Sequence, residues 1–197
     1  MEKNLNADTL KLALQGMLEM LRKIGDFQCV AIRLQKEGDF PYFHHIGFPG
    51  TFVAKESTLN IRKKDGSIVL DSQGNPLVEC MCGNILRSRT NPKYPYFTKE
   101  GAFWTNSTTH LLNSLTEKER KEIGRTRNTC HDFGYESVAL IPIRADGEIL
   151  GIIQINDPRE GLFTLNKIRK YQSLADHLGP IIVNILKFYE KINQTVN

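Results

Sequence analysis

The feature that most constrains the fold is a pair of apolar runs in the last third of the chain. Residues 135–163 read YESVALIPIRADGEILGIIQINDPREGLF, where two stretches rich in Val, Ile and Leu flank Ala145-Asp146-Gly147. Asp-Gly tolerates the positive φ angles of a tight turn, so the pattern predicts a β-hairpin. Residues 164–192 then carry apolar side chains at three- and four-residue spacing. That spacing predicts a long amphipathic helix, which Pro180 is expected to kink.

The preceding two thirds of the chain show shorter elements separated by Gly, Pro and Asp signals. Apolar residues at helical spacing predict a first helix over 8–24, and alternating apolar stretches predict strands. The further expected elements are strands at 27–34 and 40–48, an inserted loop or hairpin at 49–78, a short helix at 79–89, a strand at 102–105, and helices at 106–115 and 117–127.

Length and charge limit the classes of protein to consider. The chain has 197 residues, 40% of them hydrophobic, which suits one well-buried core and predicts a single domain over 1–197 with its core at about 8–190. The formal net charge is +4. Basic residues are scattered, and in 117–127 they alternate with glutamates, as on a solvated helix face. Nucleic acid is therefore not expected as a partner.

Targeting signals are also missing from the sequence pattern. No apolar run approaches the roughly 20 residues that a membrane span needs, and the start of the chain lacks the apolar stretch of a signal peptide. We therefore expect a cytoplasmic protein without a membrane partner. Its four cysteines, at positions 29, 80, 82 and 130, are then expected to be reduced, or to have redox or metal-binding roles.

The order of predicted elements and several local motifs resemble the GAF domain, a small-molecule sensing module. The hairpin enters the last helix through D-x-x-x-G-x-F-T at 157–164. CMCGNILR at 80–87, FWTNSTTHLL at 103–112, and RNTC followed by GYESVALIPIR are similar to GAF domains attached to bacterial and archaeal sensor histidine kinases. The resemblance implies an α/β fold with a central antiparallel sheet of about five or six strands, flanked by helices, with long terminal helices on the same side.

The resemblance also implies a function. We expect a cytoplasmic sensory domain that binds a small molecule, a redox-active cofactor or a metal and signals through its terminal helices. A histidine kinase or another signalling output domain is the implied partner, and a homodimer is the expected assembly. The residues proposed for a helical dimer interface are Leu10, Leu14, Leu21, Ile182, Ile185 and Tyr189, although several of them must instead cover the sheet.

Two groups of residues fall where a GAF ligand pocket is expected. A small-molecule site needs aromatic walls around a few polar anchors. The first group offers both, although a packed core wall with Asn106 as a helix cap explains it equally well. Its members are Phe103, Trp104, Asn106, Thr108, Tyr135 and Glu136.

The second group consists of three cysteines and a histidine, at Cys80, Cys82, Cys130 and His131. Thiolate and imidazole are ligands for zinc or iron, so a metal ion, an iron–sulfur cluster or haem is a candidate cofactor. Free cysteine is also among the most buried residue types, and the group could belong to the core. We expect Cys82 to face the pocket and Cys80 the protein interior.

A weaker resemblance points to an enzyme. The free methionine-(R)-sulfoxide reductases share the GAF fold and use a V-C-G segment and a later C-D segment, which Met81-Cys82-Gly83 and Cys130 partly match. This alternative makes Cys82 and Cys130 the nucleophilic and resolving thiols, with Asp132 or Glu136 as the acid. The chain departs from that family where His131 follows Cys130, and the D-V-H and F-P-G-H segments are missing.

Overall fold

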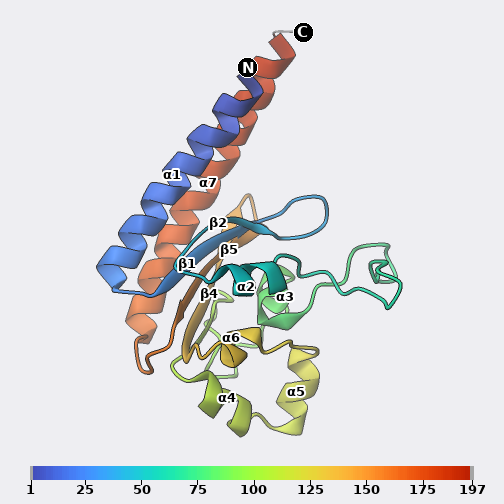
Figure 1. Ribbon diagram of the computed structural model, residues 1–197, viewed down its shortest axis with the longest axis vertical. Helices are drawn as coiled ribbons and strands as arrows, with labels where there is room; N and C mark the ends of the chain where they lie inside the picture. Colours follow the sequence, from blue (N-terminus) through green and yellow to red (C-terminus); the bar gives the residue numbers. More distant parts are fainter. Residues whose placement is uncertain (1, 196–197) are drawn as a thin grey trace.

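The computed structural model describes residues 2–195, and their side chains from 10 to 187. Figure 1 shows a central sheet with two long helices on one face and short helices on the other. In chain order the elements are α1 (Glu2–Gly25), β1 (Cys29–Leu34), β2 (Tyr42–Ile46), α2 (Gly50–Lys55), α3 (Cys80–Leu86), β3 (Phe103–Thr105), α4 (Thr108–Ser114), α5 (Glu117–Ile123), α6 (Thr129–Asp132), β4 (Ser137–Ala145), β5 (Glu148–Asp157) and α7 (Leu165–Thr195).

The sheet has five strands in the order β2-β1-β5-β4-β3, and each neighbouring pair is antiparallel. The hairpin expected from the sequence is confirmed. Ala145 pairs with Glu148, and the two residues between them, Asp146 and Gly147, have φ angles of 53° and 84°. Both positive angles match a two-residue turn of the kind that Asp-Gly favours. The α/β fold and its sheet agree with the expectation.

Alternating side chains of the central strands supply two cores. Ile141, Ile143 and Ile153 belong to a cluster with the terminal helices, whereas Leu140 and Ile152 belong to a cluster with the short helices. Strands with both faces covered read as nearly continuous apolar runs, which is why the sequence at 137–157 shows little alternation. The terminal helices α1 and α7 lie side by side (Figure 1), as expected.

The structure differs from the sequence expectations in the connecting segments. Helix α1 begins at Glu2 rather than near residue 8, and two short helices, α2 and α6, were not predicted. Both are too short to show a helical repeat. Segment 60–78 forms the expected hairpin, held by bridges such as Asn60 to Val78, and Figure 1 shows it projecting from the body.

The terminal helices bury most of the residues proposed for dimerisation. Leu10, Leu14, Leu21 and Ile182 are at most 6% exposed and pack in the core, so they cannot form an interface. Ile185 is partly buried, and the Tyr189 side chain lies outside the described residues. Amphipathic helices that cover a sheet must turn their main apolar stripe inward. Among the side chains that the structure describes on these helices, the exposed large apolar ones are instead Leu12, Met20, Ile24, Leu165, Ile181 and Leu186.

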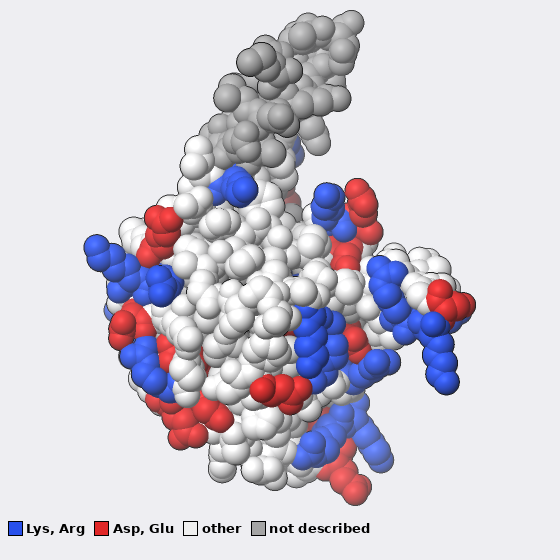
Figure 2. All heavy atoms as spheres, viewed as in Figure 1, with Lys and Arg blue, Asp and Glu red and all other residues white. Residues whose placement is uncertain are grey.

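Surface charge is mixed on the face that Figure 2 presents, where basic and acidic side chains are interspersed rather than collected in one basic area. Within residues 2–195, no helix has the length and apolar composition that crossing a membrane requires.

Candidate functional site

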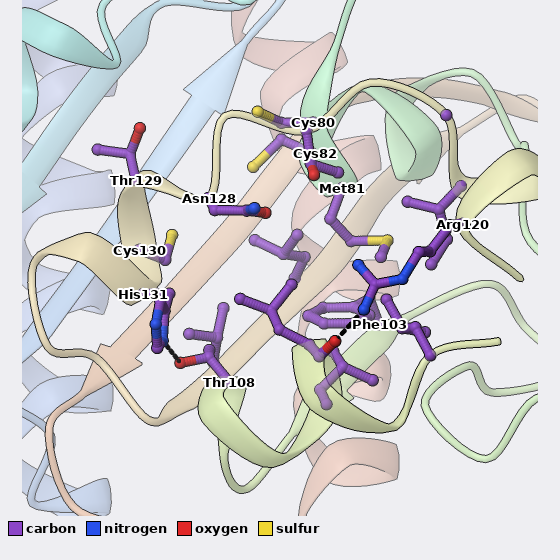
Figure 3. Close-up of a pocket in the computed structure, with 18 of the residues that line it drawn as sticks. Cys80, Met81, Cys82, Phe103, Thr108, Arg120, Asn128, Thr129, Cys130 and His131 are labelled. Atoms are coloured by element: carbon purple, nitrogen blue, oxygen red, sulfur yellow. Dashed lines mark hydrogen bonds between the residues drawn. The ribbon is translucent and has the colours of Figure 1, made fainter. Parts of the chain in front are cut away.

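A cavity of about 200 Å³ lies between the sheet and the short helices α3 to α6. Its walls are mainly apolar. Phe103, Val138 and Leu140 contribute from the sheet, and Figure 3 shows these walls in close-up. The helices and connecting segments contribute Glu56, Cys80, Met81, Cys82, Thr108, Leu111, Leu112, Leu115, Arg120, Ile123, Gly124, Thr126, Asn128, Thr129, Cys130 and His131.

Helix α4 forms one wall because of how its start is fixed. The Ser107 hydroxyl accepts a hydrogen bond from the His110 N–H, which caps the helix. Glu136 accepts hydrogen bonds from the Ser107 hydroxyl at 2.8 Å and from the Thr109 N–H at 3.0 Å. These bonds fix the start of α4, whose Leu111 and Leu115 line the cavity. They also engage the Glu136 carboxylate, which does not line the cavity.

The opposite wall is braced by a chain of buried charges. Arg33 is fully buried and donates to the carbonyl oxygens of Phe40 and Glu56 at 2.9 and 2.6 Å. The Glu56 carboxylate lies 3.2 Å from Arg127 and 3.9 Å from Arg33. Arg127 also lies 3.6 Å from Glu79. A buried carboxylate requires such partners, and this chain of charges ties β1 to the start of α3.

Arg127 also holds Cys80. Its sulfur accepts hydrogen bonds from the backbone N–H and from Nε of Arg127, at 3.1 and 3.4 Å. Its φ angle is +65°, in the left-handed region that few residues other than glycine adopt. This backbone explains why both Cys80 and Cys82 line the cavity. The expectation that Cys80 faces the interior is wrong, because it assumed regular helical geometry at both positions.

The thiols of the cavity are neutral at ordinary pH. Burial raises the pKa of Cys130 to about 12, and burial also raises the pKa of Cys82 and of Cys80. Arg33 and Arg127 act in the opposite direction on Cys82 and Cys80 respectively, but burial dominates. A thiolate is the reactive form of cysteine, so the cavity does not favour nucleophilic attack at rest.

The structure separates the residues of the first predicted group. Phe103 and Thr108 line the cavity, but Trp104 packs with the cluster on the opposite face of the sheet. Asn106 bonds both backbone polar groups of Phe163, at 2.8 and 2.9 Å, and thereby fixes the end of the connection between β5 and α7. The Tyr135 hydroxyl contacts the Cys29 sulfur at 3.3 Å in the core.

The metal and catalytic sets are also divided. Cys80, Cys82, Cys130 and His131 all line the cavity, yet among the described residues no three His, Cys, Asp or Glu side chains come together as metal ligands would. His131 Nδ1 lies 3.2 Å from the Thr108 hydroxyl, as drawn in Figure 3. Asp132 is at the surface, 3.8 Å from Lys55. Neither Asp132 nor Glu136 lines the cavity.

Several cavity residues had no sequence signal. Glu56 follows a short helix that was not predicted, and Arg120 belongs to a charged helix whose pattern indicates a solvated face. Arg120 reaches back to the carbonyl oxygen of Leu112 and joins α5 to α4 (Figure 3). The capping box at Thr116 and Glu119 could have located the start of α5, but not this contact.

Comparison with known proteins gives a family match. Residues 9–182 match the model of the GAF domain. Comparison with curated proteins finds no match.

Solved structures share the fold at low sequence identity. A type II free methionine-R-sulfoxide reductase from Thermoplasma acidophilum has a TM-score of 0.57 and 12% identity over 91% of this chain and 95% of that one. A domain from a protein described as a two-component sensor histidine kinase of Sinorhizobium meliloti 1021 has a TM-score of 0.57 and 13% identity, covering 92% and 96%. The GAF domain of a phosphoenolpyruvate-protein phosphotransferase from Coxiella burnetii has a TM-score of 0.57 and 17% identity over 89% of this chain and 83% of that one.

Proposed function

This chain belongs to the GAF domain family, and from that premise we propose that its cavity binds a small, uncharged and largely apolar molecule. The observation that carries the proposal is the wall of the cavity, where leucines of α4 face Phe103, Val138 and Leu140 of the sheet. Burial of apolar surface is the main driving force that such walls supply.

The size of the cavity limits the ligand. A dry apolar cavity of roughly 150 Å³ takes up benzene. A cavity of about 200 Å³ therefore suits a compound with one ring and a small substituent, or two fused rings. Met81 and Phe103 supply a soft thioether and an aromatic face for a flat ring.

The charges at the cavity argue for a neutral ligand. Arg120 is engaged by the Leu112 carbonyl, and Arg127 is engaged by Glu56 and Cys80. Glu56 lines the cavity, and one of its carboxylate oxygens has no hydrogen-bond partner among the described residues. Glu56 is already paired with Arg127 and Arg33, so these arginines do not compensate the hydration that an anion would lose, whereas a neutral ligand with an N–H or O–H group could donate to the unpaired carboxylate oxygen.

The route from the cavity to the terminal helices runs through β4. Val138 and Leu140 face the cavity, whereas Ala139, Ile141 and Ile143 of the same strand pack with the cluster that contains α7. A ligand shifts the arrangement of α1 and α7 only if it binds two arrangements with different affinity. We therefore propose that occupancy changes the contact between β4 and α7, and that this contact passes the signal to an output domain such as a histidine kinase.

Three probes of nearly equal shape test the proposal. Benzamide, benzoate and benzylamine differ in charge, so calorimetric titration of each reports what the cavity selects. We expect benzamide to bind and benzoate to bind at least about tenfold more weakly, because the arginines at the cavity are already engaged and do not compensate the hydration that benzoate loses. Equal or stronger binding of benzoate would contradict the neutral-ligand proposal.

A second candidate function rests on one observation: Cys82 and Cys130 both line the cavity. In a reductase of the free methionine-(R)-sulfoxide type, one thiol attacks the sulfoxide sulfur and the second forms a disulfide with release of water and methionine. The raised thiol pKa values and the placement of Asp132 and Glu136 favour the sensor. Thiol titration after adding methionine sulfoxide decides between them: two thiols lost per turnover, abolished in Cys82→Ser, would support the enzyme.

Assembly and location follow from the sensor proposal. We propose a homodimer formed through the exposed apolar residues of α1 and α7, such as Leu12 and Met20, rather than through the buried set. Analytical ultracentrifugation at tens of micromolar tests it, and a monomer would contradict it.

The cytoplasmic location stays a prediction. So does metal or haem binding, which elemental analysis and an absorption spectrum of anaerobically purified protein would test.

A further inference from the structure

A second hollow, of about 380 Å³, lies at the far end of β4. β3 pairs with β4 only from Val138 to Leu140, so the last residues of β4 have no β3 partner at this edge. The hollow is lined by Arg144 of β4, by the turn at 99–101, by the segment that follows α3 and by α7. It shares no lining residue with the cavity described above.

Arg144 is the feature of this hollow that calls for an explanation. The residue is partly buried and its backbone belongs to the β4–β5 ladder, yet its guanidinium makes no hydrogen bond or ion pair with any described residue. Nearby arginines have partners: Arg87 and Arg89 donate to the carbonyl oxygens of Pro76 and Val78. Arg169 is also without a partner among the described residues, but it is exposed on α7. A guanidinium carries five donors in a fixed fork that matches a carboxylate, so a half-buried one without a protein partner points to a ligand.

Gly101 keeps the space beside this guanidinium open. Its φ angle is +81°, and a β-carbon at this position would lie 3.2 Å from Nη2 of Arg144 and 3.4 Å from Oγ1 of Thr90. The guanidinium and the hydroxyl therefore border the same small space. Thr90 Oγ1 makes no hydrogen bond with the described residues and is free to bond the same ligand group.

The remaining charges of the hollow are balanced. Lys99 joins Arg144 as a second cation, and Glu100 and Asp176 are the two anions. Burial lowers the pKa of Arg144 while Asp176 and Glu100 act against that effect, although neither carboxylate comes within ion-pair distance. An anion alone would meet the repulsion of both carboxylates. We propose that this hollow binds a small zwitterion carrying a carboxylate and an ammonium group, as α-amino acids do.

In this arrangement the carboxylate lies on Arg144 and Thr90, and the ammonium lies toward Asp176 and Glu100. Because Asp176 belongs to α7 and Arg144 to β4, the ligand links the helix to the sheet. Charge-assisted hydrogen bonds of a bidentate arginine supply both affinity and orientation.

The test is a titration of the purified full chain with each of the twenty standard L-amino acids, followed by calorimetry or ligand-observed NMR. Acetate, methylammonium chloride and inorganic phosphate are the comparison probes, since each carries one part of the chemistry. We expect at least one amino acid to bind, with acetate and methylammonium each weaker by about tenfold or more. Arg144→Gln and Asp176→Asn should each weaken the amino acid by a similar factor.

Arg169→Gln is the matched control, because Arg169 is an exposed arginine without a partner among the described residues. The affinity of this variant for the amino acid should equal that of wild type. Asp176 is exposed, so Asp176→Asn should keep the fold even if Arg144→Gln loses stability in a thermal melt. Binding of phosphate or acetate as strong as that of any amino acid would overturn the proposal that the ligand is a zwitterion. No binding of any probe, or equal binding in the two variants and the wild type, would overturn the proposal that this hollow is a binding site.

Discussion

Gly179 of α7 lies directly on the carbonyl oxygen of Arg144 at the end of β4, so that a β-carbon at residue 179 would come within 1.8 Å of that oxygen. The last helix and the strand that also walls the cavity therefore come into close backbone contact at this point. Backbone meets backbone there, and neither side can yield by turning a side chain.

The first prediction follows from this contact. Gly179→Ala must push α7 away from β4 and should lower the free energy of unfolding by about 3 kcal/mol, measured by urea denaturation. Gly16→Ala is the control, since nothing lies within 4 Å of a β-carbon at that helical position. It should raise stability by about 0.5–1 kcal/mol, as alanine favours a helix more than glycine does. Similar stability changes in both variants would contradict the contact.

A second prediction concerns the buried charges. Arg33→Met keeps the apolar stem but leaves the carbonyl oxygens of Phe40 and Glu56 without their donor. We expect a loss of about 3 kcal/mol in the free energy of unfolding. Arg169→Met, on the exposed face of α7, should change it by less than about 0.5 kcal/mol. If Arg33→Met has the stability of wild type, the hydrogen bonds of Arg33 make no net contribution to the free energy of unfolding.

The role of Asn106 gives a third prediction. Its amide bonds both backbone groups of Phe163, so Asn106→Ala should cost about 2 kcal/mol of stability. Because Asn106 does not line the cavity, the Kd for benzamide should stay within about twofold of wild type. Asn113→Ala, at an exposed position of α4, is the control and should change neither value. A large loss of benzamide affinity in Asn106→Ala would return this residue to the ligand site.

The thiols set the fourth prediction, on pH. Burial raises the pKa of Cys130 from 9.0 to about 12, so the folded protein keeps a proton that the unfolded chain loses at lower pH. The stability that this neutral thiol contributes is fully present below pH 9 and is lost as pH rises toward 12. Urea denaturation at several pH values should show a shallower decline for Cys130→Val than for wild type. Parallel declines would show that Cys130 is not buried as a neutral thiol.

Sequence reasoning located the parts of the fold that have strong local signals. Asp146-Gly147 dictates a turn through its own backbone preferences, and α7 is long enough to show its repeat. Trp104 could not be placed, because a three-residue strand with both faces covered shows no usable alternation. Asn106 and Ser107 are both good capping residues, and local pattern does not tell which of them caps α4.

The cavity was only partly predictable for a related reason. Cys82, Cys130 and Phe103 could be assigned to it through a family resemblance. Glu56 and Arg33 meet only through the tertiary fold, and nothing in the sequence near either residue indicates the other. The left-handed backbone of Cys80, which brings a second thiol to the cavity, likewise has no local signal, and the Cys80 sulfur bonds Arg127 from 47 residues away.

The most direct test of the account fills the cavity and asks whether binding is lost. Leu111 lines the cavity and Asn113 is exposed on the same helix, so Leu111→Trp and Asn113→Trp add the same side chain inside and outside the site. Calorimetric titration with benzamide should show a Kd raised at least about tenfold in Leu111→Trp and unchanged in Asn113→Trp. Unchanged binding in Leu111→Trp, in protein that melts as wild type does, would contradict the claim that this cavity is the ligand site.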